Sequence, residues 1–392
     1  MAETKKIGIL TGGGDVPGLN PVIKSVVYGA GQIGRTVTGI RRGWEGLTHL
    51  DPNGANDDLY IRQLTRDNTR TIDRTGGTIL HTSRTNPRKM SAGKLPKNIS
   101  PDDLKKLPFD GKVYDFTSIV IRNLHRLGID CLIAIGGDDT LSFASALSKA
   151  GFPVVAVPKT MDNDVQSTEY CLGFSTAVTR ARDAITRQRA TVGSHERIGI
   201  FRIFGRDAGF TALYTAYITG IRCLIPEFPF DMGRVCDLLV EDKKNNSSNY
   251  ALIVASEGAV WKEGEVKEYG DADAFGHRKK VDIGQTLGEE IRKRTGNEVI
   301  NSDLTYDLRA GEPDIIDQIA AIGFGNIALD LIRDGVSGRM TAIQNGCYAH
   351  VPIPDAALGP RHVDVATLYN TERYRPSYAS KLGVPLLFSG GS

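Results

Sequence analysis

The sequence lacks the features that mark membrane-spanning, secreted and nucleic-acid-binding proteins. Its formal net charge is only +2 over 392 residues, too small a surplus to attract a nucleic acid or an anionic membrane. We see no apolar run as long as a membrane span, and residues 1–6 (M-A-E-T-K-K) do not resemble a signal peptide. We therefore expect a cytoplasmic protein with neither a nucleic-acid nor a membrane partner.

Cysteine and metal-binding histidine patterns are also scarce. The cysteines are odd in number and scattered, and no two of them form a C-x-x-C pair; they are Cys131, Cys171, Cys223, Cys236 and Cys347. This usage is typical of a reduced compartment, so we expect all five to be small core residues. The seven histidines include no H-x-x-x-H pair of the kind that holds a metal ion.

What the sequence has is length, glycine and short apolar runs. A chain of 392 residues can form two domains with substantial cores, and its 44 glycines suit a loop-rich α/β protein. Residues 132–135 and 154–157 are short apolar runs rich in β-branched residues. Such runs are typical of strands that are buried on both faces of a parallel sheet.

Each of these two runs ends in residues suited to phosphate chemistry. The first is followed by G-G-D-D-T at 136–140, where Asp138 and Asp139 could hold Mg²⁺. The second leads into P-K-T-M-D-N-D at 158–164, which adds one lysine and two aspartates. Because ligands bind at the carboxyl ends of strands in open α/β sheets, we expect these loops to converge. A cation, a metal ligand and a candidate base together indicate phosphoryl transfer.

These two motifs, at this spacing, resemble the paired signatures of the phosphofructokinase family. The resemblance covers most of the chain. It implies two Rossmann-like, doubly wound α/β domains with mostly parallel sheets, the phosphofructokinase fold. It also implies Mg²⁺ as cofactor and phosphoryl transfer to the 1-hydroxyl of fructose 6-phosphate, with Asp162 as the base and Asp138 on the metal ion.

The resemblance also assigns roles along the rest of the chain. A Gly-rich loop, T-G-G-G-D at 11–15, follows the first strand, and Gly13 and Gly14 match the positions that hold the phosphoryl donor. Arg84, in T-S-R, matches a donor-phosphate arginine; a solvated surface arginine is the alternative. Residues at sugar-phosphate positions are Thr160, Asp164, Arg197, Phe204, Gly205, Arg206, Glu257, Tyr306 and Arg309. Phe204 stands where relatives have Met, whereas a literal M-G-R at 232–234 lacks the expected context.

The identity of the phosphoryl donor depends on two positions. ATP-using bacterial relatives usually read G-G-D-G and P-G-T, whereas this chain has Asp139 and Lys159 there. The carboxylate of Asp139 should crowd and repel the α-phosphate of a nucleotide. Lys159 can neutralise the leaving phosphate. We therefore expect the pyrophosphate-dependent branch, with an ATP-dependent 6-phosphofructokinase as the nearest alternative and a catalytically silent regulatory subunit as the second.

The chain order suggests how the domains are divided. We expect residues 1–172 with 318–348 to bind the donor, residues 173–317 to bind the sugar phosphate, and residues 349–392 to form a tail packing across both. Residues 35–75 are expected to form short strands and polar loops, 88–116 a partly helical surface insertion, and 260–281 a charged loop. The aromatic and basic segment 369–378 is expected to pack on the surface.

The resemblance further implies an oligomer. Arg197 matches an arginine that reaches the sugar phosphate of a neighbouring subunit, so we expect a homodimer or homotetramer. Lys24 and Tyr28 stand where ATP-using bacterial relatives have paired arginines, so their effector site is not expected here. The sequence leaves open other acceptors such as sedoheptulose 7-phosphate, and the direction of the reaction in the cell.

Overall fold

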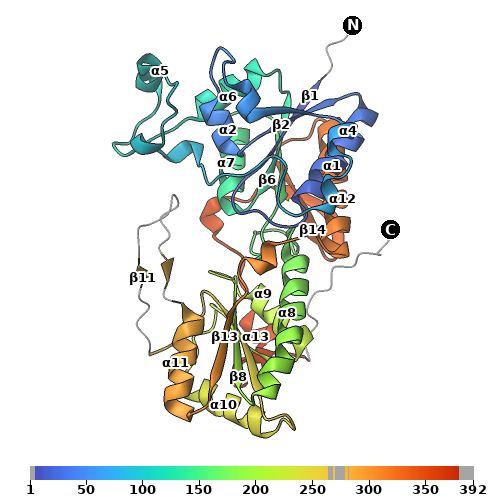
Figure 1. Cartoon of the computed structure of the whole chain (residues 1–392). Coiled ribbons are helices and arrows are strands. Elements are labelled where there is room, and N and C mark those ends of the chain that lie inside the picture. Colours follow the sequence, from blue (N-terminus) through green and yellow to red (C-terminus); the bar gives the residue numbers. More distant parts are fainter. Residues whose placement is uncertain (1–4, 264–267, 270–278, 281, 379–392) are drawn as a thin grey trace.

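The chain folds into two lobes, each built around one sheet. The computed structural model describes residues 5–263, 268–269, 279–280 and 282–378. Figure 1 shows a lobe that contains the N-terminus above a second lobe in which α8 runs along one side. A seven-stranded sheet forms the first lobe and a four-stranded sheet the second, which confirms the expected two-part α/β architecture.

The first sheet has the strand order β15-β14-β7-β6-β1-β2-β3. Its five inner strands are parallel, and an antiparallel strand closes each edge. The strands are β1 (Lys6–Thr11), β2 (Thr36–Ile40), β3 (Ile61–Leu64), β6 (Cys131–Gly136), β7 (Val154–Pro158), β14 (Arg339–Gln344) and β15 (Cys347–Pro352). Since β15 continues past residue 348, a domain boundary there would cut a strand of this sheet.

The central strands are buried because helices cover both faces of the sheet. Along β6, Ile133 and Ile135 point into one core while Leu132 and Ala134 point into the other. This alternation follows from the two-residue period of a strand, and it explains the uninterrupted apolar runs in the sequence. One face is covered by α1 (Leu19–Ala30) and α12 (Ile315–Arg333), and the other by α2 (Trp44–His49), α6 (Thr117–Arg126) and α7 (Asp138–Lys149).

Helix α12 corrects one expectation from the sequence. Its 19 residues have a mean hydropathy of 1.6 over the most apolar stretch, so by length and composition this helix could cross a membrane. Half of that stretch is buried, and the helix packs on α1, β7 and β14. Its apolar character is therefore explained by its place in the protein core.

The second sheet is wholly parallel, in the order β13-β8-β10-β9. Its strands are β8 (Ile198–Ile203), β9 (Arg222–Leu224), β10 (Ala251–Ser256) and β13 (Val299–Asp303). Contacts pair α8 (Phe174–Ser194) with α9 (Phe210–Thr219), and α10 (Met232–Lys244) with α11 (Ile283–Thr295). The register pairs Ile203 with Ser256, so β8 and β10 end side by side and bring their following loops together.

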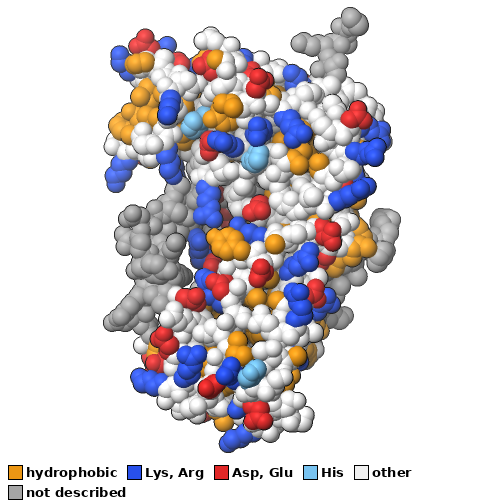
Figure 2. Space-filling model, viewed as in Figure 1, with side chains coloured by type: hydrophobic (Ala, Val, Ile, Leu, Met, Phe, Trp, Pro, Cys, Tyr) orange, Lys and Arg blue, Asp and Glu red, His pale blue; other side chains and the backbone are white. Residues whose placement is uncertain are grey.

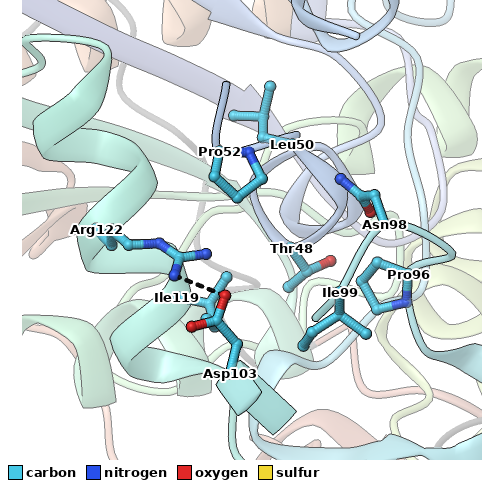
Figure 3. A pocket seen from close by; sticks show the side chains of 9 residues that line it. All are labelled: Thr48, Leu50, Pro52, Pro96, Asn98, Ile99, Asp103, Ile119 and Arg122. Atoms are coloured by element: carbon cyan, nitrogen blue, oxygen red, sulfur yellow. Dashed lines mark hydrogen bonds and ion pairs between the residues drawn. The ribbon is translucent and has the colours of Figure 1, made fainter. Parts of the chain in front are cut away.

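The insertion at 88–116 packs closely on the first lobe. It contains β4 (Met90–Ser91), α5 (Pro101–Lys106) and β5 (Val113–Tyr114) around a small core of its own. Figure 3 shows the seam, where Asp103 of the insertion forms an ion pair with Arg122 of α6 at 3.2 Å. The hollow in this seam holds about 10 Å³, room for one water molecule at most.

Several local expectations were wrong. Residues 35–75 contain helices as well as strands, namely α2, α3 (Asp57–Tyr60) and α4 (Arg66–Thr69). Within the expected charged loop 260–281, a short antiparallel pair is present, β11 (Glu268–Tyr269) and β12 (Lys279–Lys280), and residues 264–267, 270–278 and 281 lie outside the described residues. Four cysteines are buried as expected, but Cys347 is exposed on edge strand β15.

The 3₁₀ turns are η1 (Gly31–Ile33), η2 (Ile72–Arg74), η3 (Pro87–Lys89), η4 (Ala92–Lys94), η5 (Asp307–Arg309) and η6 (Ala356–Leu358).

The C-terminal tail is more deeply packed than expected. It contains α13 (Val365–Leu368) and the short pair β16 (Tyr369–Asn370) and β17 (Arg375–Pro376). Tyr369 donates a hydrogen bond to the carbonyl of Cys223 at 2.6 Å, and the amide of Cys223 donates to the carbonyl of Tyr374 at 2.9 Å. Both tyrosines are buried, so this part of the tail covers the exposed edge of β9 rather than lying on the surface. Residues 379–392 lie outside the described residues.

Candidate active site

Charged side chains gather where the two lobes meet. Figure 2 shows Lys, Arg, Asp and Glu side chains at mid-height on one face, at the level where the lobes of Figure 1 join. The loops that follow β1, β6 and β7 of the first sheet and β8 and β10 of the second carry most of the residues singled out in the sequence.

The glycine-rich loop after β1 is fixed by backbone hydrogen bonds. The amide of Gly12 donates to the carbonyl of Ile135 at 2.9 Å, which ties the loop to β6. The amide of Gly13 donates to the carbonyl of Ser83 at 3.0 Å, and Gly13 has a φ of 79°, a conformation that favours glycine. Arg84, which is exposed, therefore follows a residue that is bonded to the glycine-rich loop.

Lys159, directly after β7, is a buried cation in contact with this loop. Its side chain donates a hydrogen bond to the carbonyl of Gly14 at 2.6 Å, and the residue is only 4% exposed. Burial lowers its pKa to about 8, and the nearby guanidinium of Arg309 adds to this effect. Neighbouring carboxylates act in the opposite direction. The lysine is thus a desolvated charge, the kind that interacts strongly with an anion that replaces water.

Asp138 and Asp139 open helix α7. Gly137 precedes the helix, and the positive end of the helix dipole favours carboxylates in its first turn. Asp138 is exposed in area, yet the surrounding protein desolvates it and raises its pKa to about 7. The charges of Asp164 and Asp139 raise this pKa further, whereas Lys159 lowers it. The site therefore has excess negative charge around Asp138.

This excess of carboxylate suits a divalent cation. Within the described residues, no three His, Cys, Asp or Glu side chains form a ready-made metal cluster. Mg²⁺ does not need one, because it usually takes one or two carboxylates and completes its shell with water and substrate phosphates. Asp138, whose pKa is raised first by burial and then by the charges of Asp164 and Asp139, fits this mode of binding.

Asp162 has the environment expected of a proton acceptor. Its Oδ1 atom is buried without a hydrogen-bond partner among the described residues. Burial, then the charges of Asp164 and Glu257, raise its pKa well above the usual value for a carboxyl group. Its amide donates to the hydroxyl of Thr160 at 3.2 Å, and burial also raises the pKa of Asp164. An unpaired, more basic carboxylate oxygen is what general-base catalysis requires.

On the second sheet, the turn after β8 lies against the end of β10. The amide of Glu257 donates to the carbonyl of Ile203 at 2.9 Å. Gly205 has a φ of 124°, and a Cβ at this position would lie 2.7 Å from the carbonyl oxygen of Ala208, so the turn requires glycine. Arg206, the next residue, is partly exposed.

Glu257 is paired with an arginine that the sequence reading did not single out. Arg202 on β8 donates to Glu257 at 3.3 Å and to Asp303 at 2.7 Å. Burial raises the pKa of Glu257, and the positive charges of Arg202, Arg206 and Arg309 oppose that rise. Arg202 therefore helps keep Glu257 ionised at the end of β10.

Arg309 joins the two halves of the site. Its guanidinium lies 4.5 Å from the centre of the Phe204 ring, a cation–π contact with the second sheet. The same group lies 4.0 Å from the carboxylate of Asp15, which follows the glycine-rich loop of the first sheet. A Cβ added to Gly14 would come within 2.7 Å of it. Tyr306 lies beside Phe204, with 6.4 Å between ring centres, and is 80% exposed.

Arg197 is the one candidate that the structure does not bring to this group within a single chain. It precedes β8, at the end of the strand opposite to Phe204 and Arg206, and forms an ion pair with Glu298 at 2.5 Å. The literal M-G-R at 232–234 starts α10 rather than following a strand end.

Sequence reasoning missed three residues that shape the site. Arg202 could have been noted as a charge within an otherwise apolar strand. Asn163 lies between the two motif aspartates, and its φ of 55° is a backbone conformation that asparagine tolerates better than most residues. Arg361 lies in the tail, where no sequence pattern marks it, yet its guanidinium contacts the loop after β7.

With this geometry in view, comparisons with known proteins identify the family. Fold and site together define a two-lobed α/β protein with charged loops at the carboxyl ends of both sheets. The family model described as Phosphofructokinase matches residues 6–332, more than half of the chain. The chain belongs to the phosphofructokinase family.

Relatives with two kinds of name are equally similar to the chain. A pyrophosphate–fructose 6-phosphate 1-phosphotransferase from Streptomyces coelicolor is 37% identical over 365 residues, covering 92% of this chain and 97% of that protein. An ATP-dependent 6-phosphofructokinase from Corynebacterium efficiens is 37% identical over 346 residues, covering 86% and 90%. The structure of a pyrophosphate-dependent phosphofructokinase from Nitrosospira multiformis superposes with a TM-score of 0.76 at 16% identity, covering 96% and 89%, which supports the fold.

Proposed function

We propose that the protein catalyses reversible phosphoryl transfer from pyrophosphate to the 1-hydroxyl of fructose 6-phosphate. The products are fructose 1,6-bisphosphate and phosphate. One observation carries the proposal: a buried cation, Lys159, and a carboxylate, Asp139 at the start of α7, both follow the ends of adjacent strands. Because the bonds broken and formed have similar energies, the reaction should run in both directions.

The donor is expected to lie between the glycine-rich loop and α7. Gly13 and Gly14 leave room for phosphate oxygens, and Lys159 is already bonded to the carbonyl of Gly14. Asp139 disfavours a longer donor, because a third phosphate group would bring negative charge towards its carboxylate. Arg84 follows the residue bonded to Gly13 and is assigned to the donor phosphates.

The acceptor is expected to bind against the second sheet. Asp162 takes the proton of the 1-hydroxyl, with Thr160 and Asp164 positioning the reacting groups. Glu257 accepts hydrogen bonds from sugar hydroxyls. Arg206, Arg309 and Tyr306 meet the 6-phosphate, with Phe204 and Gly205 shaping that turn. Guanidinium groups suit a dianionic phosphate, because they donate to it in pairs.

Asp138 is the residue that would hold Mg²⁺. The ion supplies positive charge at the donor oxygens when it is bound. Lys159 and Arg84 add positive charge from the protein and orient the donor. Asp162 remains the only group in this scheme that accepts a proton.

The same proposal extends to the whole molecule. The donor-binding domain comprises residues 1–172 with 318–348, extended to Pro352 so that β15 stays whole, and the sugar-phosphate-binding domain comprises residues 173–317, with the remaining tail packed across both. Arg197 serves the site of a neighbouring subunit in a homodimer or homotetramer. Four buried free cysteines suit a reduced cytoplasmic location.

An ATP-dependent 6-phosphofructokinase is the second candidate. It is favoured by one observation, namely that relatives with that name are as similar as those named for pyrophosphate. Under this alternative, the sugar acceptor and the residue proposed as the base stay the same. The two candidates differ only in what the loop at Asp139 admits.

Initial rates with fructose 6-phosphate and Mg²⁺ test the proposal. Pyrophosphate and ATP are supplied separately at equal concentrations, and fructose 1,6-bisphosphate is measured. We expect turnover with pyrophosphate and little with ATP. Turnover with ATP alone would replace the proposal by the second candidate, and no turnover with either donor would contradict both.

A further inference from the structure

The C-terminal tail contacts the loop that carries the proposed base. This loop, residues 159–173, leaves β7 and returns to start α8. The amide of Arg361 donates to the carbonyl of Asp164 at 2.6 Å. Its guanidinium donates to the carbonyl of Asn163 at 2.7 Å and to that of Glu169 at 3.3 Å. The tail therefore holds the backbone on both sides of the loop's turn.

The loop needs such support because its backbone adopts an unfavourable conformation at one residue. Asn163, directly after Asp162, has a φ of 55°, which costs more than an extended or helical conformation. Its side chain is buried and bridges the turn, donating to the carbonyl of Glu169 at 3.0 Å and accepting from the amide of Cys171 at 2.8 Å. Arg361 bonds to the two carbonyls, of Asn163 and Glu169, that lie at the ends of this bridge.

The guanidinium of Arg361 is itself fixed in place. It lies 4.4 Å from the centre of the Phe210 ring at the start of α9 in the second lobe. The neighbouring His362 ring is 2.9 Å from the carbonyl of Asp207, and the amide of Val363 donates to Glu227 at 2.9 Å. One short stretch of tail thus joins the loop of the first lobe to the turn before α9 of the second.

We propose that Arg361 is a positioning residue, whose hydrogen bonds to the backbone of residues 159–173 hold the loop that carries Asp162 in its active conformation. It touches no reacting group in the proposed reaction, and its effect on Asp162 passes through the backbone of Asn163 and Asp164. This inference rests on the proposed function for its catalytic consequence. Whether Arg361 holds the loop is a separate question, and it can be answered by a measurement that does not depend on enzymatic activity.

Hydrogen–deuterium exchange tests the holding directly. In the full-length protein, Arg361→Ala should speed exchange of amides in peptides that cover residues 160–173, because loop opening becomes easier. Arg373→Ala is the matched control: this arginine is exposed in the same tail and should leave those amides unchanged. Equal exchange in the wild type and Arg361→Ala would overturn the proposal, whether or not the protein is active.

Kinetics test the consequence for catalysis. A misplacement of about 1 Å can cost about 10²-fold, so Arg361→Ala should lower kcat to that extent while KM for fructose 6-phosphate changes little. Arg361→Lys, which keeps one donor, should lie between, and it serves in place of Arg361→Ala if that variant does not fold. A kcat within twofold of wild type in both variants would contradict the catalytic part.

Chemical rescue distinguishes positioning from general loss of stability. Arg361 borders a hollow of about 330 Å³ whose lining is completed by Ser167, Thr168, Glu169, Ile343, Gln344 and Asn345. This space can admit free guanidinium. Millimolar guanidinium should restore part of the kcat of Arg361→Ala without raising its Tm, and should not raise the kcat of Arg373→Ala. No rescue, together with a Tm loss that accounts for the lower kcat, would assign Arg361 a purely structural role.

Discussion

The two sides of the candidate site are built differently. On the first sheet, Lys159 is 4% exposed and hydrogen-bonded to the glycine-rich loop, and Asp162, whose Oδ1 atom is buried, has a raised pKa. On the second sheet, Tyr306 is 80% exposed and Arg206 is partly exposed. The first sheet therefore supplies a cation and a candidate base that are largely withdrawn from water before any ligand binds, whereas Tyr306 and Arg206 of the second sheet remain open to solvent.

This difference indicates where catalysis and binding are expected to separate. Fixed charges in a desolvated setting act on the transition state, because they need little reorganisation during the reaction. Exposed arginines and tyrosines mainly contribute to binding, and each costs less to remove. Substitutions on the first sheet should thus lower kcat or change donor selectivity, and substitutions on the second should raise KM for the sugar phosphate.

The largest effect is expected for Asp162→Asn. Loss of the proposed base should lower kcat by about 10²–10⁴-fold, with KM for fructose 6-phosphate nearly unchanged. Because the folded state raises the pKa of Asp162, the ionised carboxylate destabilises the fold, and stability is lost as pH rises through that pKa. The neutral variant should therefore be at least as stable as wild type at pH 7. Unchanged turnover would remove Asp162 from the role of base.

The next effect concerns Lys159. Lys159→Met should lower kcat/KM for pyrophosphate by about 10²–10³-fold at pH 7. Because the wild-type pKa is about 8, kcat/KM should also fall as pH rises through that value, and this alkaline fall should be absent in the variant. The lowered pKa means that the charged lysine destabilises the fold below pH 8 and that this penalty fades above it. A Tm of Lys159→Met well below wild type at pH 7 would contradict the account.

A moderate effect is expected for Asp139→Gly. Removing the carboxylate should raise the ratio of kcat/KM for ATP to that for pyrophosphate by about 10–10²-fold, because like charges at close range cost one to several kcal/mol. Asp139→Asn keeps the size and removes the charge, so it separates repulsion from crowding. If neither variant changes the ratio, Asp139 does not select the donor.

The smallest effect is expected on the second sheet. Phe204→Met removes the ring that stacks on Arg309 and should raise KM for fructose 6-phosphate by about two- to fivefold, the value of a partly exposed cation–π contact. Phe204→Tyr keeps the ring and should bind as wild type. A fall in kcat larger than the rise in KM would show that the second sheet does more than bind.

The fold was largely predictable because its main elements obey simple periodicities. The uninterrupted apolar runs of β6 and β7 predict central parallel strands, and the sequences of α8 and α12 have clear helical patterns. Short edge elements such as β9, β13 and β15 were missed. They have few residues and are defined by their partners in the sheet rather than by an alternation of their own.

The candidate site was predictable only where a motif carried it. The loop that carries Lys159 and Asp162 could be recognised from its residue types and their spacing. Arg202 and Arg361 could not be recognised in this way, because their importance comes from contacts between segments that are far apart in sequence, such as residue 361 with residue 163. The buried part of the tail at Tyr369 and Tyr374 was missed for the same reason.

The most direct test of the central claim compares kcat/KM for pyrophosphate and for ATP in the wild-type protein. Both are measured with saturating fructose 6-phosphate and Mg²⁺ at pH 7. We expect a ratio well above one in favour of pyrophosphate, because Asp139 and Lys159 fit a two-phosphate donor. A ratio below one would contradict the claim that these two residues select pyrophosphate.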